Sequence, residues 1–416
     1  MPSAPVDNSR IAVPSLCAPM RFVGRQPIVD EQGRLFGYEL LFRDKPADAR
    51  PSDPEAATRQ IVDYWSMLPT NRSDGFAFVN CTRTSLVDGT VTLLPSSNTI
   101  LEILEDIEPD AELLRACRAL RKQGYRLALD DFSPDPARAS LIEVADFVKV
   151  DFRASDAKTR SEIYAMVRGA GARCLAEKIE TQEERGFAVE EGCSLFQGYF
   201  FARPVTIESK ALPQNHLVCL RLLAALQRHP ADLREIERLV MSDASMTYRV
   251  LRLANSALYG LSKEVTSVQR ALMMVGDDAV RRMVSVAVAT ALAGNRFTPV
   301  LSMALVRARF CELLAPRIGA AEEELYLLGL LSLLDVLLET PIERILEELP
   351  IGPGMKAALA GRPSGGLCPL ELVKCMESCD WPRCEAMAQA AGLSEEVVAG
   401  LYLEAVQWAT SAAAAK

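Results

Sequence analysis

The stretch Arg126–Val150, RLALDDFSPDPARASLIEVADFVKV, decides the fold prediction because it places two adjacent carboxylates directly after a short apolar run. The run LAL ends in Asp130 and Asp131, and a second run, FVKV, carries Lys149 between apolar neighbours. Both runs have the length and aliphatic content of buried strands. Adjacent carboxylates repel each other unless a proton or cation lies between them, so the pair indicates a divalent metal site. The alternative is a helix N-cap or a solvated turn, because aspartate is common after strands.

The composition is that of an ordinary globular protein with more than one domain. A chain of 416 residues is long enough for two or three domains, and 49% hydrophobic with 24% charged residues is typical of globular chains. The net charge of −9 argues against a nucleic-acid partner, because no basic surplus is present to displace counterions.

Neither a membrane nor a secretory segment is expected. The longest apolar run, Leu325–Leu334, is too short to span a bilayer, and residues 1–20 carry no apolar core of a signal peptide. The 11 cysteines are mostly irregularly spaced, which is typical of reduced thiols. We therefore predict a cytoplasmic protein in which residues 1–20 form a flexible tail.

Strand and helix patterns alternate from residue 21 to residue 205. Besides the two strands of the opening stretch, strands are predicted within Arg21–Arg43 (two, joined by a polar turn) and at Phe76–Asn80, Thr99–Leu104, Arg173–Ile179 and Ser194–Phe201. Helices are predicted at Glu55–Leu68, Asp110–Gln123, Ser155–Ala170 and Gln182–Glu191. This alternation predicts an α/β, TIM-like barrel of parallel strands wrapped by helices.

Polar side chains recur at or near the ends of these predicted strands. They are Glu39, Asn80, Glu102, Asp130, Asp131, Lys149, Glu177 and Gln197. The carboxyl ends of barrel strands meet at one face, so these side chains should gather there. One lysine cannot neutralise five or six carboxylates, and uncompensated buried charge is costly. Oxygen ligands of this kind suit Mg²⁺ or Mn²⁺, and such a site suits the hydrolysis of phosphate esters.

The order of the motifs resembles the EAL domain, a barrel that binds cyclic di-GMP and, in active members, hydrolyses it to the linear dinucleotide. The resemblance covers about Arg21–Pro204. It is carried by Gln26–Val29 (QPIV), Glu39–Arg43 (ELLFR), Asn80, Glu102–Glu105 (EILE), Asp130–Phe132 (DDF), Lys149–Asp151 (KVD), Ala176–Thr181 (AEKIET, for A-E-G-V-E-T), Phe196–Tyr199 (FQGY) and Pro204.

The resemblance implies a role for each matching residue. Glu39, Asn80, Glu102 and Asp130 would hold one metal ion, and Asp131 would complete a second site that shares Asp130. Lys149 and Glu177 would bracket the attacking water as the catalytic pair, with Glu177 as base or metal ligand. The substrate site would comprise Gln26 and Arg43, which contact the dinucleotide, with Glu180 and Gln197 behind them.

Three departures from the EAL pattern bear on activity. Leu40 and Leu104 replace the alanine and the threonine of the family's motifs. After DDF the chain has SPDP at 133–136, where active members carry a Gly-Thr-Gly-Tyr-Ser-Ser-type loop that couples dimerisation to assembly of the second metal site. Two prolines stiffen this shortened loop. We therefore expect binding of cyclic di-GMP with weak or lost hydrolysis, and an active metal-dependent phosphodiesterase is the alternative.

The second half changes to a helical period. Helices are predicted at Leu217–Gln227, Leu233–Met241, Ser245–Asn255, Ser267–Met274, Asp278–Ala293, Val300–Ala315, Glu322–Glu339 and Glu343–Glu348. This half resembles an HDOD domain, a catalytically silent relative of HD phosphohydrolases, most specifically in Leu239–Leu261. Ser332 and Leu333 stand where an HD protein shows His-Asp, so no histidine-metal hydrolase site is expected.

The order of the two halves resembles the YuxH type of bacterial EAL-HDOD signalling protein. It implies a barrel at 21–205 that binds cyclic di-GMP and a helical domain at 206–416 that engages an unidentified partner protein; a homodimer is a further expectation. Four cysteines cluster at Cys368, Cys375, Cys379 and Cys384. A zinc or redox cluster is one interpretation, but buried thiols are favoured because no histidine helps and no C-x-x-C pair occurs.

Overall fold

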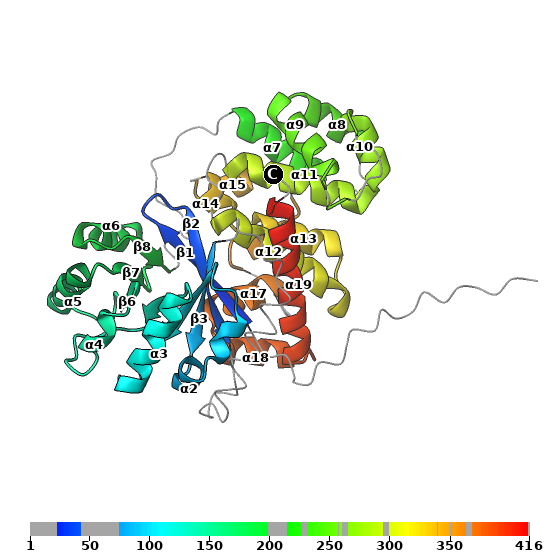
Figure 1. The fold of residues 1–416 in the computed structure, drawn as a ribbon. Coiled ribbons are helices and arrows are strands. Elements are labelled where there is room, and N and C mark those ends of the chain that lie inside the picture. The colour runs from blue at the N-terminus through cyan, green and yellow to red at the C-terminus, as the bar shows by residue number, and fades with distance from the viewer. Residues whose placement is uncertain are drawn as a thin grey trace, which may run out of the picture.

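The computed structural model describes residues 23–42, 75–198, 214–226, 232–256, 258–259, 265–293, 299–338, 340–349, 351–362 and 368–414. Within these residues a closed eight-stranded barrel is followed by a helical half, as predicted (Figure 1). Three predictions lie outside the described residues, namely the tail at 1–20, the helix Glu55–Leu68 and the side chain of Arg43.

The barrel strands follow one another in chain order around the barrel. They are β1 (Val23–Asp30), β2 (Leu35–Phe42), β3 (Phe76–Cys81), β4 (Thr99–Ile103), β5 (Arg126–Leu129), β6 (Phe147–Asp151), β7 (Arg173–Glu177) and β8 (Leu195–Gln197). Strands β2 to β8 are parallel, whereas β1 is antiparallel to both of its neighbours, β2 and β8. The expectation of parallel strands is therefore wrong for β1.

The reason lies in the turn between β1 and β2. Asp30 Oδ1 accepts hydrogen bonds from the backbone N–H groups of Gln32 and Arg34, both at 2.9 Å, and Gly33 has φ 73°. Such a short turn closes a hairpin, whereas a parallel connection needs a crossover of a dozen or more residues. The first residues of β1 therefore lie beside the carboxyl ends of the other strands.

Short helices cover the outside of the barrel. They are α2 (Arg83–Val87), η2 (Thr90–Leu93), α3 (Ala111–Lys122), α4 (Ala139–Ile142), α5 (Ala157–Ala170) and α6 (Gln182–Glu191). The predicted helices that correspond to α3, α5 and α6 are confirmed, and each begins with a side-chain cap from Asp110, Asp156 or Thr181. Helices α2 and α4 have five and four residues, too few for a clear helical period, and were not predicted.

The helical half packs its elements around one large apolar core. They are α7 (Gln214–Ala225), α8 (Leu233–Met241), α9 (Ala244–Ala254), α10 (Val268–Val275), α11 (Asp277–Ala293), α12 (Pro299–Leu314), η4 (Ala315–Arg317), α13 (Glu322–Leu331), α14 (Leu334–Leu338), α15 (Ile342–Glu348), α16 (Pro353–Leu359), α17 (Pro369–Ser378), α18 (Trp381–Ala390) and α19 (Glu395–Ala414). None of the helices in these described residues is long and apolar enough to cross a membrane.

One predicted helix, Glu322–Glu339, is wrong as a single element. Helix α13 ends at Leu331 and α14 begins at Leu334. The Ser332 hydroxyl donates to the Gly329 carbonyl at 2.7 Å, a local side-chain bond of the kind that competes with helix continuation. The break falls at the Ser332–Leu333 pair that the sequence had singled out.

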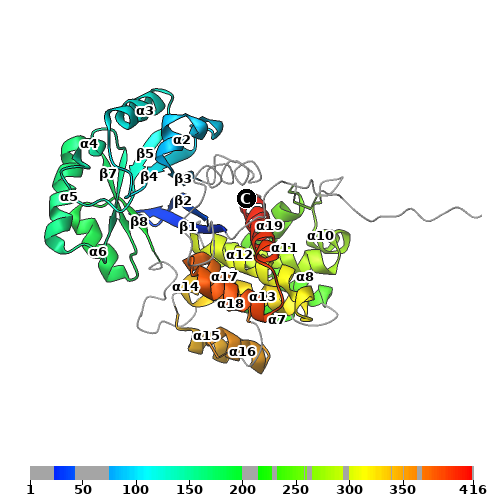
Figure 2. The same cartoon turned by 90° about the horizontal axis from the view of Figure 1, so that it is seen from below.

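The two halves touch along β1 and β2 (Figures 1 and 2). Helix α17 packs on β1, and the Tyr38 hydroxyl lies 3.3 Å from Ser302 Oγ of α12. Leu403 of α19 belongs to the same apolar cluster as the barrel's outer core. The helical half therefore lies against the side of the barrel where β1 runs in the opposite direction.

Candidate functional site

A layer of polar side chains lies directly above the apolar filling of the barrel. The filling comes from Ile28, Phe78, Ile100, Ala128, Phe147, Leu175 and Leu195. Side chains two positions apart on a strand share a face. Two residues after each filling residue of β3 to β8 stand Asn80, Glu102, Asp130, Lys149, Glu177 and Gln197. Strand β1 runs the other way, so Gln26 takes the equivalent place two residues before Ile28, opposite Glu39 of β2.

Lys149 lies at the centre of this layer. Its Nζ is 3.2 Å from Glu39 Oε1, 2.9 Å from Glu102 Oε1, 2.7 Å from Asp130 Oδ1 and 2.8 Å from Glu177 Oε1. The Lys149 side chain is 1% exposed, and those of Glu39, Glu102 and Glu177 are all under 10% exposed. An ammonium group has three hydrogens for these four carboxylates. The cluster is therefore buried, crowded and short of positive charge.

This shortage shifts the pKa values of the layer. Burial raises the pKa of Glu177 to about 8, with Lys149 opposing the shift and Glu39 and Asp130 adding to it. Burial also raises the pKa of Glu102 well above its usual range. Desolvation alone would lower the pKa of Lys149, but the surrounding carboxylates outweigh it and raise that pKa. The cluster thus keeps its lysine charged and favours a proton on Glu177 and Glu102.

The oxygen atoms of the layer fit a divalent cation. Asn80 Oδ1 is buried and accepts no hydrogen bond from any described residue. Neither oxygen of Glu102 is in hydrogen-bonding geometry with a described donor, although Oε1 pairs with Lys149. Within the described parts, no three His, Cys, Asp or Glu side chains already surround one ion position, because the carboxylates converge on the Lys149 ammonium. Unsatisfied carboxylate and amide oxygens are the ligands that hard divalent ions prefer.

Of the other predicted site residues that the structure describes, two join the polar layer and two lie outside it. Gln197 Nε2 donates to Gln26 Oε1 at 2.8 Å and to Glu39 Oε2 at 2.6 Å, so both glutamines join the layer. Glu180 instead pairs with Arg153 at 2.6 Å. Asp131 is exposed, with φ 38°, next to Asp130. The structure thus brings together eight of the predicted residues, and it leaves Asp131 and Glu180 at the rim.

Comparison with known proteins identifies the family. The EAL domain model matches residues 90–204, and the HDOD domain model matches residues 212–339. The cyclic di-GMP phosphodiesterase CdgJ of Vibrio cholerae is 34% identical over 398 residues, which cover 93% of this chain and 92% of CdgJ. The uncharacterized protein YuxH of Bacillus subtilis is 32% identical over 400 residues, which cover 93% of this chain and 97% of YuxH.

The chain belongs to the EAL-HDOD family. The resemblance drawn from the motifs is therefore confirmed. Among solved structures, the Bacillus subtilis YkuI protein, with an EAL domain and in complex with substrate c-di-GMP and calcium, matches with a TM-score of 0.36 and 19% identity, covering 53% of this chain and 71% of YkuI. A likeness of that size carries no argument about this chain.

A lysine replaces the glycine of the EAL pattern at position 178. Lys178 has φ 56°, a left-handed conformation in which glycine is favoured. Its ammonium pairs with Asp151 and also acts electrostatically on Asp131. A cation therefore lies at the Asp131 edge of this EAL site, where the resemblance implied the second metal ion.

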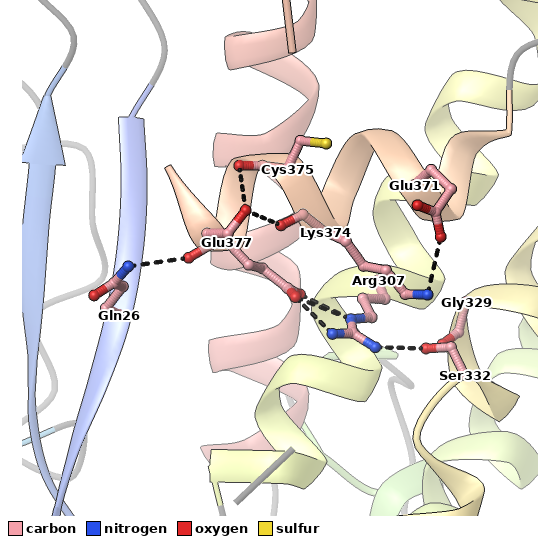
Figure 3. A network of polar contacts seen from close by, with 9 residues as sticks. Gln26, Arg307, Gly329, Ser332, Glu371, Lys374, Cys375 and Glu377 are labelled. Carbon is pink, nitrogen blue, oxygen red and sulfur yellow. Dashed lines mark hydrogen bonds and ion pairs between the residues drawn. The ribbon is translucent and has the colours of Figure 1, made fainter. Parts of the chain in front are cut away.

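In the helical half, Ser332 contacts the guanidinium group of Arg307 and not a group of metal-ligating side chains. Arg307 Nη1 donates to Ser332 Oγ at 3.1 Å, and Arg307 forms a bidentate pair with Glu377, at 2.6 Å from Nη2 to Oε2 and 2.9 Å from Nε to Oε1 (Figure 3). Both side chains are about 5% exposed or less. The sequence analysis missed this pair. Arg307 among the apolar residues of α12 and Glu377 near the end of α17 were the available signal, since a charge is conspicuous on an apolar helix.

The cysteine cluster of the helical half does not converge on one point. A hydrogen bond between the Cys375 and Cys384 thiols lowers the pKa of Cys375 and raises that of Cys384. Cys379 instead faces the barrel, 3.9 Å from Gln26 Nε2. Cys375 and Cys384 are buried, whereas Cys368 and Cys379 are half-buried, so the interpretation as buried thiols holds for two of the four.

Proposed function

We propose that this chain is a cyclic di-GMP signalling protein whose EAL barrel binds the dinucleotide at the carboxyl ends of β2 to β8. Membership of the EAL-HDOD family supports this, and the CdgJ protein to which the chain is similar is named a cyclic di-GMP phosphodiesterase. The observation that carries the proposal is the single polar layer with Lys149 at its centre. We place the domains at 21–205 and 206–416.

In this proposal Mg²⁺ or Mn²⁺ binds at the same layer. Glu39, Asn80, Glu102 and Asp130 would hold the ion, with Asp131 available for a second, and the unsatisfied oxygens of Asn80 and Glu102 support this assignment. When bound, the ion would supply the positive charge that the phosphodiester's oxygens need and that the carboxylate cluster lacks. The carboxylates of Glu39, Glu102 and Asp130, which now surround the Lys149 ammonium, would then be shared between that ammonium and the ion.

The dinucleotide itself would meet Gln26 and Arg43, with Gln197 and Glu180 behind them. Gln26 and Gln197 form one hydrogen-bonded pair, so Gln197 sets the orientation of the Gln26 amide. An arginine suits phosphate because its planar donor fork matches two phosphate oxygens. Glu180 is held by Arg153 at the rim, which supports an indirect role.

Hydrolysis to the linear dinucleotide is the second candidate function, and one contact favours it. Glu177 lies 2.8 Å from Lys149, and its pKa of about 8 suits a group that accepts and returns a proton near neutral pH. A protein that only binds the nucleotide has no need of such a pair. Against it, SPDP at 133–136 forms a short turn, with Asp135 N–H donating to Ser133 O at 2.8 Å, in place of the loop of active members.

The helical half is proposed to engage a protein partner. The chain's net charge of −9 argues against nucleic acid in this role. A protein partner and a homodimer are both predictions. Pull-down tests the first, and light scattering tests the second.

The experiment is titration of the purified full chain with cyclic di-GMP in Mg²⁺, in Mn²⁺ and in chelator, with chromatography of the products. We expect saturable binding. If the second function holds, Glu177→Gln should bind but yield no linear dinucleotide, while Glu183→Gln, an exposed carboxylate on α6, should match the wild type. Absence of binding under all three conditions would contradict the proposed function.

A further inference from the structure

The turn between α17 and α18, Glu377–Trp381, lies on the end of the barrel that carries the polar layer. We call it the α17–α18 corner. A Cβ atom on Gly24 would lie 2.5 Å from Cys379 Sγ and 3.2 Å from Trp381 Cη2. Because β1 is antiparallel, Gly24 lies beyond Gln26 on the side of the carboxyl ends of β2 to β8. The corner therefore covers the barrel mouth at β1. In the chain it comes after residue 339, where the segments matched by the EAL and HDOD models end.

Every polar atom of the Gln26 side chain is already engaged. Its Nε2 donates to the Glu377 carbonyl at 3.4 Å and to Cys379 Sγ at 3.9 Å, and its Oε1 accepts from Gln197. The Glu377 carbonyl is one of the last in α17, which lack partners within their own helix. A glutamine amide has two N–H donors and one oxygen. A ligand that takes hydrogen bonds from Gln26 must therefore displace the corner.

The corner is held in place by the core of the helical half. Glu377 contributes its carbonyl to Gln26 and its carboxylate to Arg307, which also contacts Ser332 (Figure 3). Cys379, which closes α17, has φ 58°, a left-handed conformation that fixes the direction of the chain into α18. Because breaking the buried ion pair is costly, the corner is tied to the helical half and should move together with it.

We propose that the α17–α18 corner is an intramolecular latch that competes with the dinucleotide for Gln26, so that nucleotide binding and docking of the helical half oppose each other. This inference rests on the proposed function, because it takes Gln26 to be part of the nucleotide site. Its consequence is that cyclic di-GMP releases the surface of the helical half that now lies on β1. The Glu377 ion pair transmits that release to α12 and α13.

Two variants loosen the latch from opposite sides. Gly24→Ala places a methyl group against Cys379 without changing the helical half. Cys379→Gly removes the thiol beside Gln26 without changing the barrel, and glycine suits its left-handed backbone. The matched control is Gly186→Ala on α6, where an added Cβ meets nothing within 4 Å. We expect both latch variants to bind cyclic di-GMP more tightly, by about 5- to 150-fold, the usual range of coupling between two sites, and the control to match the wild type.

Thiol labelling followed by peptide mass spectrometry reports the latch directly, because the half-buried Cys379 contacts Gln26 of the barrel, and the equally half-buried Cys368 provides an internal reference. Cyclic di-GMP should accelerate labelling of Cys379 in the wild type, and Gly24→Ala should do so without nucleotide. If the wild type binds the nucleotide but neither affinity nor Cys379 labelling changes, the latch is wrong and the proposed function stands. If Gly24→Ala exposes Cys379 but no protein binds cyclic di-GMP, the proposed function is wrong, and competition for the nucleotide falls with it.

Discussion

The two buried ionic clusters of this molecule differ in how well their charges balance. In the barrel, one ammonium faces four carboxylates. In the helical half, one guanidinium faces one carboxylate, and Arg307 Nη1 also donates to Ser332. A buried pair is stable only when its charges and hydrogen bonds are satisfied, so the second cluster is complete by itself. The barrel cluster carries excess negative charge, so it needs bound protons or a cation. This need for a cation is what a metal-binding site requires.

Loss of the arginine should give the largest effect. Arg307→Met leaves Glu377 charged and buried without its partner, and we expect it to lower the free energy of unfolding by about 3–5 kcal/mol. Arg307→Met with Glu377→Met should recover much of the loss. Urea unfolding measures both. Arg383→Met, which breaks an exposed pair with Glu371, should cost about 1 kcal/mol or less. A loss of that small size for Arg307→Met would show that the buried pair is not structural.

Divalent metal should act on the barrel cluster only. At a concentration about 100-fold above its dissociation constant, an ion that binds the folded state adds about 2.7 kcal/mol. Mg²⁺ or Mn²⁺ should therefore raise the melting temperature of the wild type and of Arg307→Met. Asp130→Asn should abolish the rise, whereas Asp106→Asn, an exposed neighbour, should keep it. If neither ion changes the melting temperature of the wild type, a metal site at this layer is excluded.

The same contrast explains how much of the site could be predicted from the sequence. Glu102 and Glu177 stand inside apolar strands, where a charge is conspicuous, and strand alternation brings them together. The contact of Gln26 with Glu377 could not be predicted, because it joins residues 351 positions apart through the packing of two domains. The direction of β1 could have been predicted, since the four residues between Asp30 and Leu35 permit only a hairpin.

The contribution of Glu177 to the free energy of unfolding should fall as the pH rises. The folded pKa of Glu177, about 8, lies above its usual value of 4.5, so between these values the folded state binds more protons than the unfolded state. The contribution to stability is present below pH 4.5 and is lost as the pH rises through 8. Metal-free protein should lose up to about 1.4 kcal/mol per pH unit for this proton. Denaturation across this range should show a shallower slope for Glu177→Gln, and an equal slope would contradict the assignment.

The smallest effect on stability concerns Lys178, the cation at the rim of the cluster. Lys178→Gly relieves a left-handed backbone, worth about 1 kcal/mol, and removes a pair with Asp151 in which the lysine side chain is 56% exposed, worth about 0–1 kcal/mol. The net change should therefore be near zero.

Metal affinity should change more, because Lys178 repels a cation at Asp131. Lys178→Met separates the two causes, since it removes the charge but keeps the strained backbone. If charge governs the rim, both variants should bind Mn²⁺ several-fold more tightly in calorimetric titration. If only the glycine variant does, the backbone turn after β7 limits the site. If neither does, Asp131 is not a ligand, and the barrel cluster closes around a single ion.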